Sequence, residues 1–209
     1  MLTKPDAGWT YFSLSEEYYP LSYLTEIPKT WLKEAITGLE TMKSFTVSGC
    51  CEPGHFRCTV DWQKCHITAE VESDDESGKM HSVSETLPVD MVTFCRMLYE
   101  DLNNHLLEWA KWSAWIEDAN QPEVLKKMEE LKDNLKHLEK LLEGRNARAI
   151  TQLVEHRKRI ERMRNGEKLK CPRCKAEAFG ALGNPETSKV FRCSHCGCGM
   201  SLTVPMRIK

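Results

Sequence analysis

Two Cys-x-x-Cys pairs near the end of the chain constrain its folding more than any other feature. The first pair is Cys171 and Cys174, the second is Cys193 and Cys196, and 18 residues lie between the pairs. Two thiolates at this spacing can wrap one side of a tetrahedral ion, and a second pair brought back by a hairpin completes a closed shell of four sulfurs. The sequence therefore predicts one structural Zn²⁺ site. Four thiolates leave no open position for water, so we expect no chemistry at the metal.

The segment that contains these pairs resembles the zinc-ribbon family over about residues 168–205. The likeness rests on a Cys-Pro-Arg-Cys knuckle, a Cys-Ser-His-Cys-Gly knuckle and three stretches with the composition of strands, residues 178–181, 189–192 and 201–204. The resemblance implies that the four cysteines are the ligands, one by one. It also implies contact with DNA, RNA or protein, or the role of a structural cap. Cys198 and His195 lie close by, and either could in principle replace a ligand.

The composition is typical of a soluble globular protein in a reducing compartment. Apolar residues make up 41% of the chain and charged residues 29%, and no run approaches the roughly 18 apolar residues that a membrane-spanning helix needs. The first 12 residues carry a single lysine and no apolar core, so they do not form a secretory signal. We therefore expect a cytoplasmic protein with ten reduced thiols and no membrane partner.

Residues 1–117 are predicted to form an α+β domain. Apolar and polar residues alternate in several stretches, which is typical of strands with one buried face. The predicted strands lie near residues 9–14, 45–47, 56–60, 65–71 and 79–86. Apolar residues at three-to-four spacing predict one helix over about residues 28–42 and another of nearly 30 residues after Pro88. We expect an antiparallel β-meander of three or four strands packed by these two helices.

A helical segment is predicted to follow over residues 118–166. Asn120 suits an N-cap, and Pro122 suits the first turn of a long helix. The apolar residues of this helix alternate steps of three and four, as in a coiled-coil seam. They are Met128, Leu131, Leu135, Leu138 and Leu142. The seam fails at Gly144, which marks either a kink or the turn of a helical hairpin. The apolar seam could be covered within such a helical hairpin, or by a second copy of the chain in a homodimer through residues 122–143.

Charge is distributed unevenly along the chain. Residues 1–143 carry 14 Lys and Arg against 26 Asp and Glu, a balance of −12, whereas residues 144–175 carry 11 against 3, a balance of +8. A basic helix joined to a basic knuckle could neutralise several phosphates, so we predict nucleic-acid contact through residues 145–175. The predicted contacts are Arg157, Lys158, Arg159, Arg162, Arg164, Lys168, Lys170 and Arg173.

Two simpler interpretations of this basic run stay open. It could face the acidic part of the chain or an acidic partner protein, or it could be a solvated helix face. No aromatic residue interleaves residues 145–175, which argues against stacking of single-stranded bases.

A second group of cysteines and histidines lies in the strand region. Its members are Cys50, Cys51, His55, Cys58, Cys65 and His66. Such a group could form another metal site or supply a thiol nucleophile. Strand alternation favours a simpler interpretation, because Cys58 and Cys65 share the parity of their apolar neighbours and the two histidines point to the opposite face. A second metal site formed by Cys50, Cys51 and His55 remains an alternative.

No motif of an enzyme is present. The sequence lacks a glycine-rich phosphate loop, a nucleophile elbow, a His-Glu-x-x-His helix and the deaminase pairing of His-x-Glu with Cys-x-x-Cys. We therefore expect a non-enzymatic zinc-binding adaptor or regulator whose basic helix and zinc ribbon, residues 167–209, contact nucleic acid or a nucleoprotein complex.

Two alternatives to this function are considered. The first is a protein–protein interaction factor of the inhibitor or immunity type, which acts through the acidic N-terminal domain and has a purely structural ribbon. The second is an enzyme or ligand sensor with a site between the sheet and Trp31 or Trp62.

Overall fold

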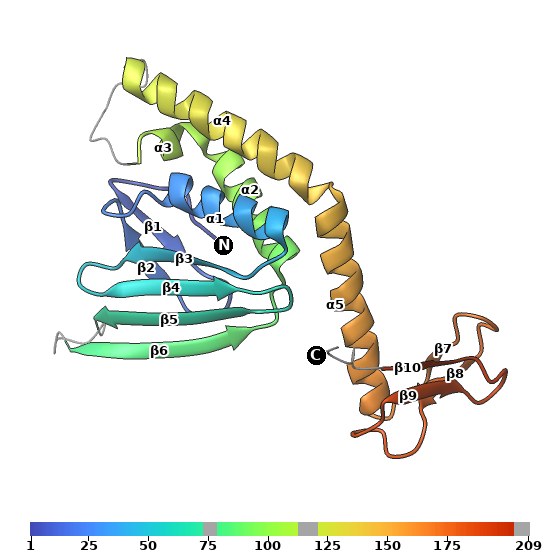
Figure 1. Ribbon diagram of the computed structural model, residues 1–209. Coiled ribbons are helices and arrows are strands. Elements are labelled where there is room, and N and C mark those ends of the chain that lie inside the picture. The colour runs from blue at the N-terminus through green and yellow to red at the C-terminus, as the bar shows by residue number, and fades with distance from the viewer. Residues whose placement is uncertain (73–78, 113–120, 203–209) are drawn as a thin grey trace, which may run out of the picture. The chain divides into compact units, whose positions relative to one another are not determined.

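The computed structural model describes residues 1–72, 79–112 and 121–202. The chain forms two compact units, Met1–Thr151 (unit 1) and Gln152–Lys209 (unit 2). Each unit has a four-stranded antiparallel sheet of its own (Figure 1). The chain is thus a mixed α+β protein. Among the described helices, none is both long and apolar enough to cross a membrane.

The sheet of unit 1 has the strand order β3-β4-β5-β6, and each strand pairs antiparallel with the next. The strands are β3 (Phe45–Cys50), β4 (His55–Val60), β5 (Cys65–Glu72) and β6 (Met80–Leu87). This arrangement confirms the predicted antiparallel strands. The register places Val47 opposite Cys58 and Cys58 opposite Ile67. Directly opposed residues share a face, so the apolar residues of neighbouring strands meet on one side of the sheet.

The two faces of this sheet differ as the alternation predicts. On β4, Phe56, Cys58 and Val60 are fully buried, whereas the residues between them are exposed. On the polar face, the hydroxyls of Thr46 and Thr59 lie 3.0 Å apart across two strands. One face therefore forms the core and the other faces solvent.

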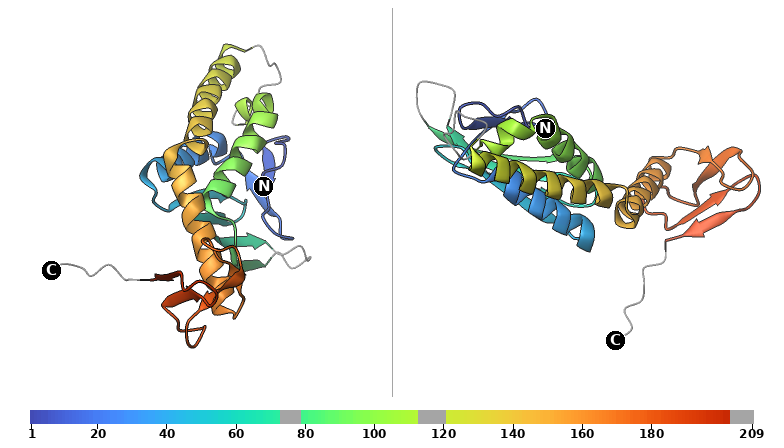
Figure 2. Two further views of the ribbon diagram at one scale, coloured as in Figure 1. Left: turned by 90° about the vertical axis from the view of Figure 1, so that its right-hand side faces the viewer. Right: turned by 90° about the horizontal axis from the view of Figure 1, so that it is seen from above.

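Two helices cover the apolar face of the sheet (Figures 1 and 2). Helix α1 (Ile27–Thr41) has Pro28 in its first turn, where a missing N–H costs little. Helix α2 (Met91–Asn104) is capped by Asp90, whose side chain accepts a hydrogen bond from the backbone N–H of Thr93. The helix predicted over residues 28–42 is therefore present with nearly the same bounds.

An aromatic cluster fills the space between the sheet and the helices. The ring of Phe56 lies 4.7 Å from that of Phe12, 5.3 Å from that of Tyr19 and 6.1 Å from that of Trp31, measured between centroids. None of these four side chains is more than 2% exposed. The indole N–H of Trp31 donates to the Ser48 carbonyl at 2.8 Å, so the one polar group of this ring is paired inside the core.

A β-hairpin precedes α1, of which the sequence predicted only the first strand. The hairpin consists of β1 (Trp9–Phe12) and β2 (Tyr19–Ser22). Pro20 interrupts the alternation in the sequence, but a proline is tolerated in an edge strand because no partner needs its N–H. The Tyr19 hydroxyl donates to Glu85 of β6 at 2.8 Å. Burial and this hydrogen bond raise the pKa of Tyr19.

The prediction of a single long helix after Pro88 is wrong in one respect, because the helix is interrupted at His105. His105 has a φ of −129° and a ψ of 40°, and α3 (Leu106–Ala110) begins after it. The break brings two tryptophans inward: Trp109 is 1% exposed, and Trp112 donates its indole N–H to a backbone carbonyl at 2.7 Å. Their rings lie 5.2 Å apart. The rest of the predicted helix lies outside the described residues.

Helix α4 (Pro122–Leu142) lies against α1, α2 and α3 of the same unit. Its buried residues are Val124, Leu131, Leu135 and Leu138. The Tyr99 hydroxyl donates to Glu139 at 3.0 Å, and His137 lies 3.1 Å from Glu40, so polar contacts flank this interface. The predicted coiled-coil seam is therefore occupied within unit 1. Its leucines complete the helical layer of unit 1, and the homodimer through residues 122–143 stays a prediction.

Gly144 separates α4 from helix α5 (Arg145–Arg164). In the first turn of α5, the Asn146 side-chain amide donates to the carbonyls of Leu39 and Glu40 at the end of α1, at 2.9 Å each. The part of α5 that belongs to unit 1 does not run alongside α4. Gly144 is thus a break between successive helices. The predicted N-cap, Asn120, lies outside the described residues, and Gln121 is the N-cap of α4.

Unit 2 contains the second sheet, with the strand order β10-β9-β8-β7. The strands are β7 (Leu169–Lys170), β8 (Glu177–Ala181), β9 (Val190–Cys193) and β10 (Gly199–Ser201). Strands β8, β9 and β10 overlap the three predicted stretches, and β7 is an addition. Residues 203–204 of the last predicted stretch lie outside the described residues.

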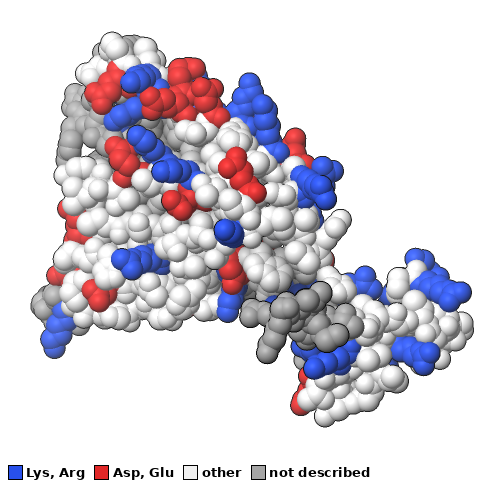
Figure 3. Space-filling view, viewed as in Figure 1, with Lys and Arg blue, Asp and Glu red and all other residues white. Residues whose placement is uncertain are grey.

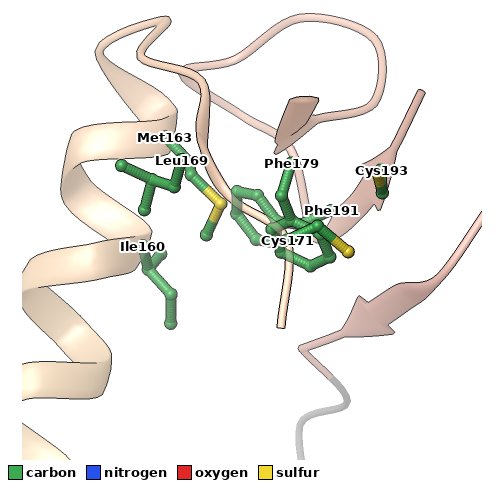
Figure 4. Packing of buried hydrophobic residues seen from close by; sticks show 7 residues of the cluster. All are labelled: Ile160, Met163, Leu169, Cys171, Phe179, Phe191 and Cys193. Atoms are coloured by element: carbon green, nitrogen blue, oxygen red, sulfur yellow. The ribbon is translucent and has the colours of Figure 1, made fainter. Parts of the chain in front are cut away.

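The core of unit 2 combines the sheet with the end of α5 (Figure 4). Ile160 and Met163 of α5 pack against Leu169, Phe179 and Phe191 in a single buried cluster. The helix end and the strands therefore share one small core, and the two cysteines that join it belong to the metal centre.

Candidate metal centre

The first cysteine pair closes a tight backbone turn, or knuckle. The Cys171 carbonyl accepts a hydrogen bond from the backbone N–H of Lys175 at 3.0 Å. The backbone N–H of Cys171 donates to the Ala176 carbonyl at 2.8 Å. Lys175 has a φ of 65°, in the left-handed region that is costly for a residue with a side chain. Its ammonium group donates to the Pro172 carbonyl at 3.0 Å and so adds a further bond to the turn.

The second pair repeats this pattern. The Cys193 carbonyl accepts from the N–H of Gly197 at 3.0 Å, and the N–H of Cys193 donates to the Cys198 carbonyl at 2.7 Å. Gly197 has a φ of 72°, which glycine adopts without strain. Arg192 donates from Nε to the Gly197 carbonyl at 3.0 Å. The two knuckles are therefore equivalent in backbone structure, with Gly197 in the place of Lys175 and Cys198 in that of Ala176.

The four predicted thiols converge. The sulfurs of Cys171, Cys174, Cys193 and Cys196 all lie within 4.8 Å of one another. The sulfurs of Cys171 and Cys196 are 3.6 Å apart, and those of Cys174 and Cys193 are 3.7 Å apart. A Zn–S bond of about 2.3 Å in tetrahedral geometry places the sulfurs about 3.8 Å apart. Each of these two sulfur pairs has one member in each knuckle, so the two knuckles are already at the separation that a tetrahedral zinc ion requires.

The two alternative ligands lie outside this group. The structure's described part contains one group of metal-ligating side chains, and it includes neither Cys198 nor His195. His195 occupies the middle of the second knuckle and is exposed. Cys198 takes the position that Ala176 has in the first knuckle, where the backbone carbonyl has the structural role. The Cys198 thiol is hydrogen-bonded to that of Cys171, so it lies next to the group of four without being one of its members.

Without a cation the thiols cannot all be ionised. The backbone N–H of Cys174 is the main cause that lowers the pKa of the Cys171 thiol, to about 6. At Cys174 the backbone N–H of Ala176 acts in the same direction, but burial and the neighbouring thiols outweigh it and raise the pKa. The thiolate of Cys171 is therefore favoured, whereas the neighbouring thiol of Cys174 keeps its proton. A divalent cation would displace the thiol protons and hold four thiolates at once.

The first cysteine of each knuckle is also part of the core. Cys171 and Cys193 are at most 1% exposed and belong to the buried cluster shown in Figure 4, whereas Cys174 and Cys196 are partly exposed. Sequence reasoning found all four thiols from their spacing. It did not find that Ile160 and Met163 pack in the same cluster as Cys171 and Cys193, because that depends on tertiary contact.

The basic residues predicted to contact nucleic acid fall into two groups. Three are paired within unit 2: Arg157 lies 3.3 Å from Glu161, Lys158 lies 3.6 Å from Glu155, and Arg162 pairs with Glu167. The others make no ion pair with any described residue. They are Arg159, Arg164, Lys168, Lys170 and Arg173. On the face shown in Figure 3, Lys and Arg outnumber Asp and Glu over the surface of unit 2.

Two of the unpaired cations are partly immobilised. The stem of Lys168 crosses Gly180 of β8 so closely that a side chain at that glycine would meet it. The Nε atom of Arg164 is buried and has no hydrogen-bond partner in the described structure. Lys168 is nevertheless exposed, as are Arg159, Lys170 and Arg173, and these last three have neither kind of contact.

In the strand region, two of the cysteines lie in the core and the two histidines lie on the exposed face. Cys58 and Cys65 are fully buried beneath the helices, and a hydrogen bond between their thiols, with burial, raises the pKa of Cys58. His55 and His66 are on the exposed face. Cys50, Cys51 and His55 do not converge into a metal-ligating group among the described residues.

No protein-family model, no curated protein and no solved structure matches the chain. The tetracysteine group and the strands around it are consistent with a site like that of a zinc ribbon, and the chain is assigned to no family.

Proposed function

We propose that this chain is a zinc-binding protein whose tetracysteine centre is structural. One observation carries the proposal: four thiols from two equivalent knuckles lie within 4.8 Å of one another. Zn²⁺ suits four thiolates in tetrahedral geometry, and a closed shell has no position for a reacting water. We therefore propose a non-enzymatic role. The ten free thiols support a reducing compartment such as the cytoplasm.

We further propose that unit 2 binds nucleic acid through its phosphate backbone. Unit 2 carries 13 Lys and Arg against 5 Asp and Glu, a net charge of +8, whereas unit 1 carries 16 against 26. Arg159, Lys170 and Arg173 supply exposed charge that no described carboxylate neutralises. Such cations gain free energy when they displace the counterions condensed on a polyanion.

The aromatic residues of unit 2 favour a duplex over a single strand. Its two aromatic rings are Phe179 and Phe191, and both are buried in the core. Binding of single strands usually depends on exposed rings on which bases stack. Unit 2 offers no such ring, so backbone contact with a duplex is the form of binding that its surface supports.

A salt titration of the full chain tests this proposal. Binding to short duplex DNA, duplex RNA and the corresponding single strands is followed by fluorescence anisotropy at several salt concentrations. The test variant combines Arg159→Gln, Lys170→Gln and Arg173→Gln. Each phosphate contact contributes about 0.9 to the slope of log K against log salt, so the loss of three contacts reduces the slope by up to about 3.

A second triple variant is the matched control. It combines Arg157→Gln, Lys158→Gln and Arg162→Gln and removes the same formal charge from cations that are already paired. We expect a clearly smaller change in slope. Equal changes in the two variants would contradict the proposed surface, and absence of binding at low salt would contradict nucleic-acid binding altogether. A protein partner captured through acidic unit 1 would then favour the interaction-factor alternative.

A further inference from the structure

The sheet of unit 1 has two edges, and its β3 edge is closed by side chains of the same unit. The Ser48 carbonyl accepts a hydrogen bond from the indole N–H of Trp31 at 2.8 Å. Two residues further on, the N–H of Cys50 donates to the Thr25 hydroxyl at 3.1 Å. In an antiparallel strand, the backbone groups of alternate residues point to opposite neighbours. Ser48 and Cys50 therefore point away from β4, and unit 1 itself supplies partners for this edge.

The β6 edge is open. A row of residues, one from each strand, runs across the sheet through Ser48, Arg57, Thr68 and Ser84. Along such a row, pairs that exchange backbone hydrogen bonds alternate with pairs that do not. Since Ser48 points outward, only Arg57 and Thr68 exchange bonds, and Ser84 points outward at the other edge. The same holds for the other even-numbered residues of β6, which are Met80, Ser82 and Thr86. No group in the described part of the chain is hydrogen-bonded to these outward backbone groups, and β6 is the last strand of the sheet (Figure 1).

Strand β6 also lacks the features that usually protect an edge, which are lysine, proline and β-bulges. Its eight residues contain no lysine or proline, and they pair with β5 without a shift of register. The outward residues are uncharged and exposed. On the core side, Val83, Glu85 and Leu87 are only half-buried, whereas the equivalent residues of β4 are fully buried. A strand with unpaired backbone groups and a partly uncovered face can accept a further strand.

We propose that a second copy of this chain adds its own β6 to this edge, antiparallel and about a two-fold axis at Val83. The two strands bond only through residues that point outward in both, so Ser82 of one copy pairs with Ser84 of the other. In the same way, Met80 of one copy pairs with Thr86 of the other. The shared ladder thus extends over almost the whole of each strand.

The side chains of β6 favour this register and this partner. On the core side, Val83 lies opposite Val83 of the second copy, and His81 lies opposite Glu85. Apolar side chains therefore meet each other, and an imidazole faces a carboxylate. A shift of the ladder to either side would place Val83 opposite Glu85 or His81 instead. The strand is thus complementary to itself in the one register that also gives the longest ladder.

The closed β3 edge limits the assembly to two chains. A two-fold interface uses the same surface on both copies, so both β6 edges are occupied in the dimer. The two edges that remain are those of β3, where Trp31 and Thr25 already pair with the backbone. This dimer differs from the homodimer predicted through residues 122–143, because it does not involve α4. It is also independent of the metal centre and of nucleic-acid binding.

The unaltered chain provides the first test. Sedimentation equilibrium over about a hundredfold range of protein concentration should show the mass rise from that of one chain to that of two. Hydrogen exchange followed by NMR should locate the interface. The amides of Ser82, Ser84 and Thr86 should exchange at least about tenfold more slowly in the dimer, whereas those of Val83 and Glu85, which point to β5, should change little. A mass of one chain at every concentration would overturn the proposal.

A pair of proline variants tests the edge itself. Ser84→Pro removes an outward N–H and breaks no hydrogen bond within the sheet, and the two-fold axis removes it twice from the interface. The dissociation constant of the dimer should rise at least about tenfold, which corresponds to about 1.4 kcal/mol. Ser48→Pro makes the same change at the closed edge and should leave the dissociation constant unchanged. Equal dimerisation of Ser84→Pro and the unaltered chain would contradict the proposal.

Exchange of charge tests the register and the identity of the partner. One variant combines Ser82→Lys with Ser84→Lys, and the other combines Ser82→Glu with Ser84→Glu. Both positions are exposed, so the fold should be kept. Each variant alone places like charges opposite each other and should stay monomeric, whereas an equimolar mixture should form a dimer with one chain of each kind. A mixture that stays monomeric, or variants that dimerise alone as the unaltered chain does, would overturn the proposal even if a proline variant fails to fold.

Discussion

The two units of this chain are held together in different ways. Unit 1 buries large aromatic rings between a sheet and several helices, with Trp31 and Phe56 at their centre. Unit 2 has a core of seven buried residues, and two of these, Cys171 and Cys193, are also candidate metal ligands. Burial spread over many residues stabilises the first unit, whereas the second combines a small core with one ion. Removal of a metal ligand should therefore affect unit 2, whereas removal of a buried aromatic ring should affect unit 1.

The largest effect is expected from Cys193→Ser. This change removes one ligand and one core residue of unit 2, and structural zinc sites contribute about 10 to 16 kcal/mol of apparent binding free energy. We expect loss of one zinc per chain and unfolding of the ribbon strands, while unit 1 stays folded. Metal analysis and the amide spectra of the two units check this outcome. Acidification should have the same effect, because protons compete with the metal for thiolates.

Cys198→Ser is the matched control for this experiment. It alters a cysteine in the same knuckle that lies outside the group of four. The zinc content should stay at one per chain. If Cys198→Ser releases the metal and Cys193→Ser keeps it, then the ligand set is different from the one that the sulfur positions indicate.

The converse change is Phe56→Ala in unit 1. This ring is fully buried and contacts three other aromatic side chains, so its truncation should lower the free energy of unfolding of unit 1 by about 3 to 5 kcal/mol. Zinc should remain bound. Urea denaturation followed through tryptophan fluorescence measures the loss. Release of zinc from the folded variant would show that the two units do not have separate sources of stability.

Leu138→Ala tests whether α4 belongs to unit 1 in solution. Leu138 is fully buried, so its truncation should cost about 2 to 5 kcal/mol of the stability of unit 1. Since the seam is occupied within the unit, the sedimentation coefficient should be the same for the variant and the unaltered chain. A concentration-dependent dimer that Leu138→Ala dissociates would instead support the homodimer predicted through residues 122–143.

The smallest effects are expected at the equivalent turn positions of the two knuckles. Gly197→Ala places a side chain at a φ of 72°, where there is open space, so only the backbone cost of about 1 kcal/mol remains. Lys175→Gly relieves the same conformation, and part of the gain is offset by loss of the ammonium bond to the Pro172 carbonyl and by the greater freedom of glycine in the unfolded chain. Chelator competition should show weaker zinc retention in the first variant and equal or slightly stronger retention in the second. If zinc retention became weaker in both variants, the equivalence of the two knuckles would be contradicted.

Much of unit 1 could be predicted because its strands have one buried and one exposed face. Alternation placed Phe56, Cys58 and Val60 on the core side, and the structure confirms it. The interruption at His105 was not predicted, because the apolar spacing is helical on both sides of it. Just after the break, the Trp112 indole N–H donates to the carbonyl of Thr25, which is far away in the sequence, and periodicity carries no information on such a contact.

The leucines of α4 show a different limit. A seam such as that of Leu131, Leu135 and Leu138 states that a helix face is apolar but does not say what covers it. The covering here comes from the preceding helix α3 and from α1 and α2, which are farther away in the sequence. The metal centre was easier to predict, because the spacing within each Cys-x-x-Cys pair is itself the geometric requirement. The support from Ile160 and Met163 depends on tertiary contact and was therefore not predicted.

The unequal burial of the four cysteines gives an expected order in which ligands are lost. Each knuckle has one buried cysteine, Cys171 or Cys193, and one partly exposed cysteine, Cys174 or Cys196. A competing chelator would meet the exposed sulfurs first and displace one thiolate from each knuckle. The ion would then still be held by one buried thiolate from each side. Transfer of the metal can thus begin while both hairpins remain joined through it, so its early steps do not require the ribbon to open.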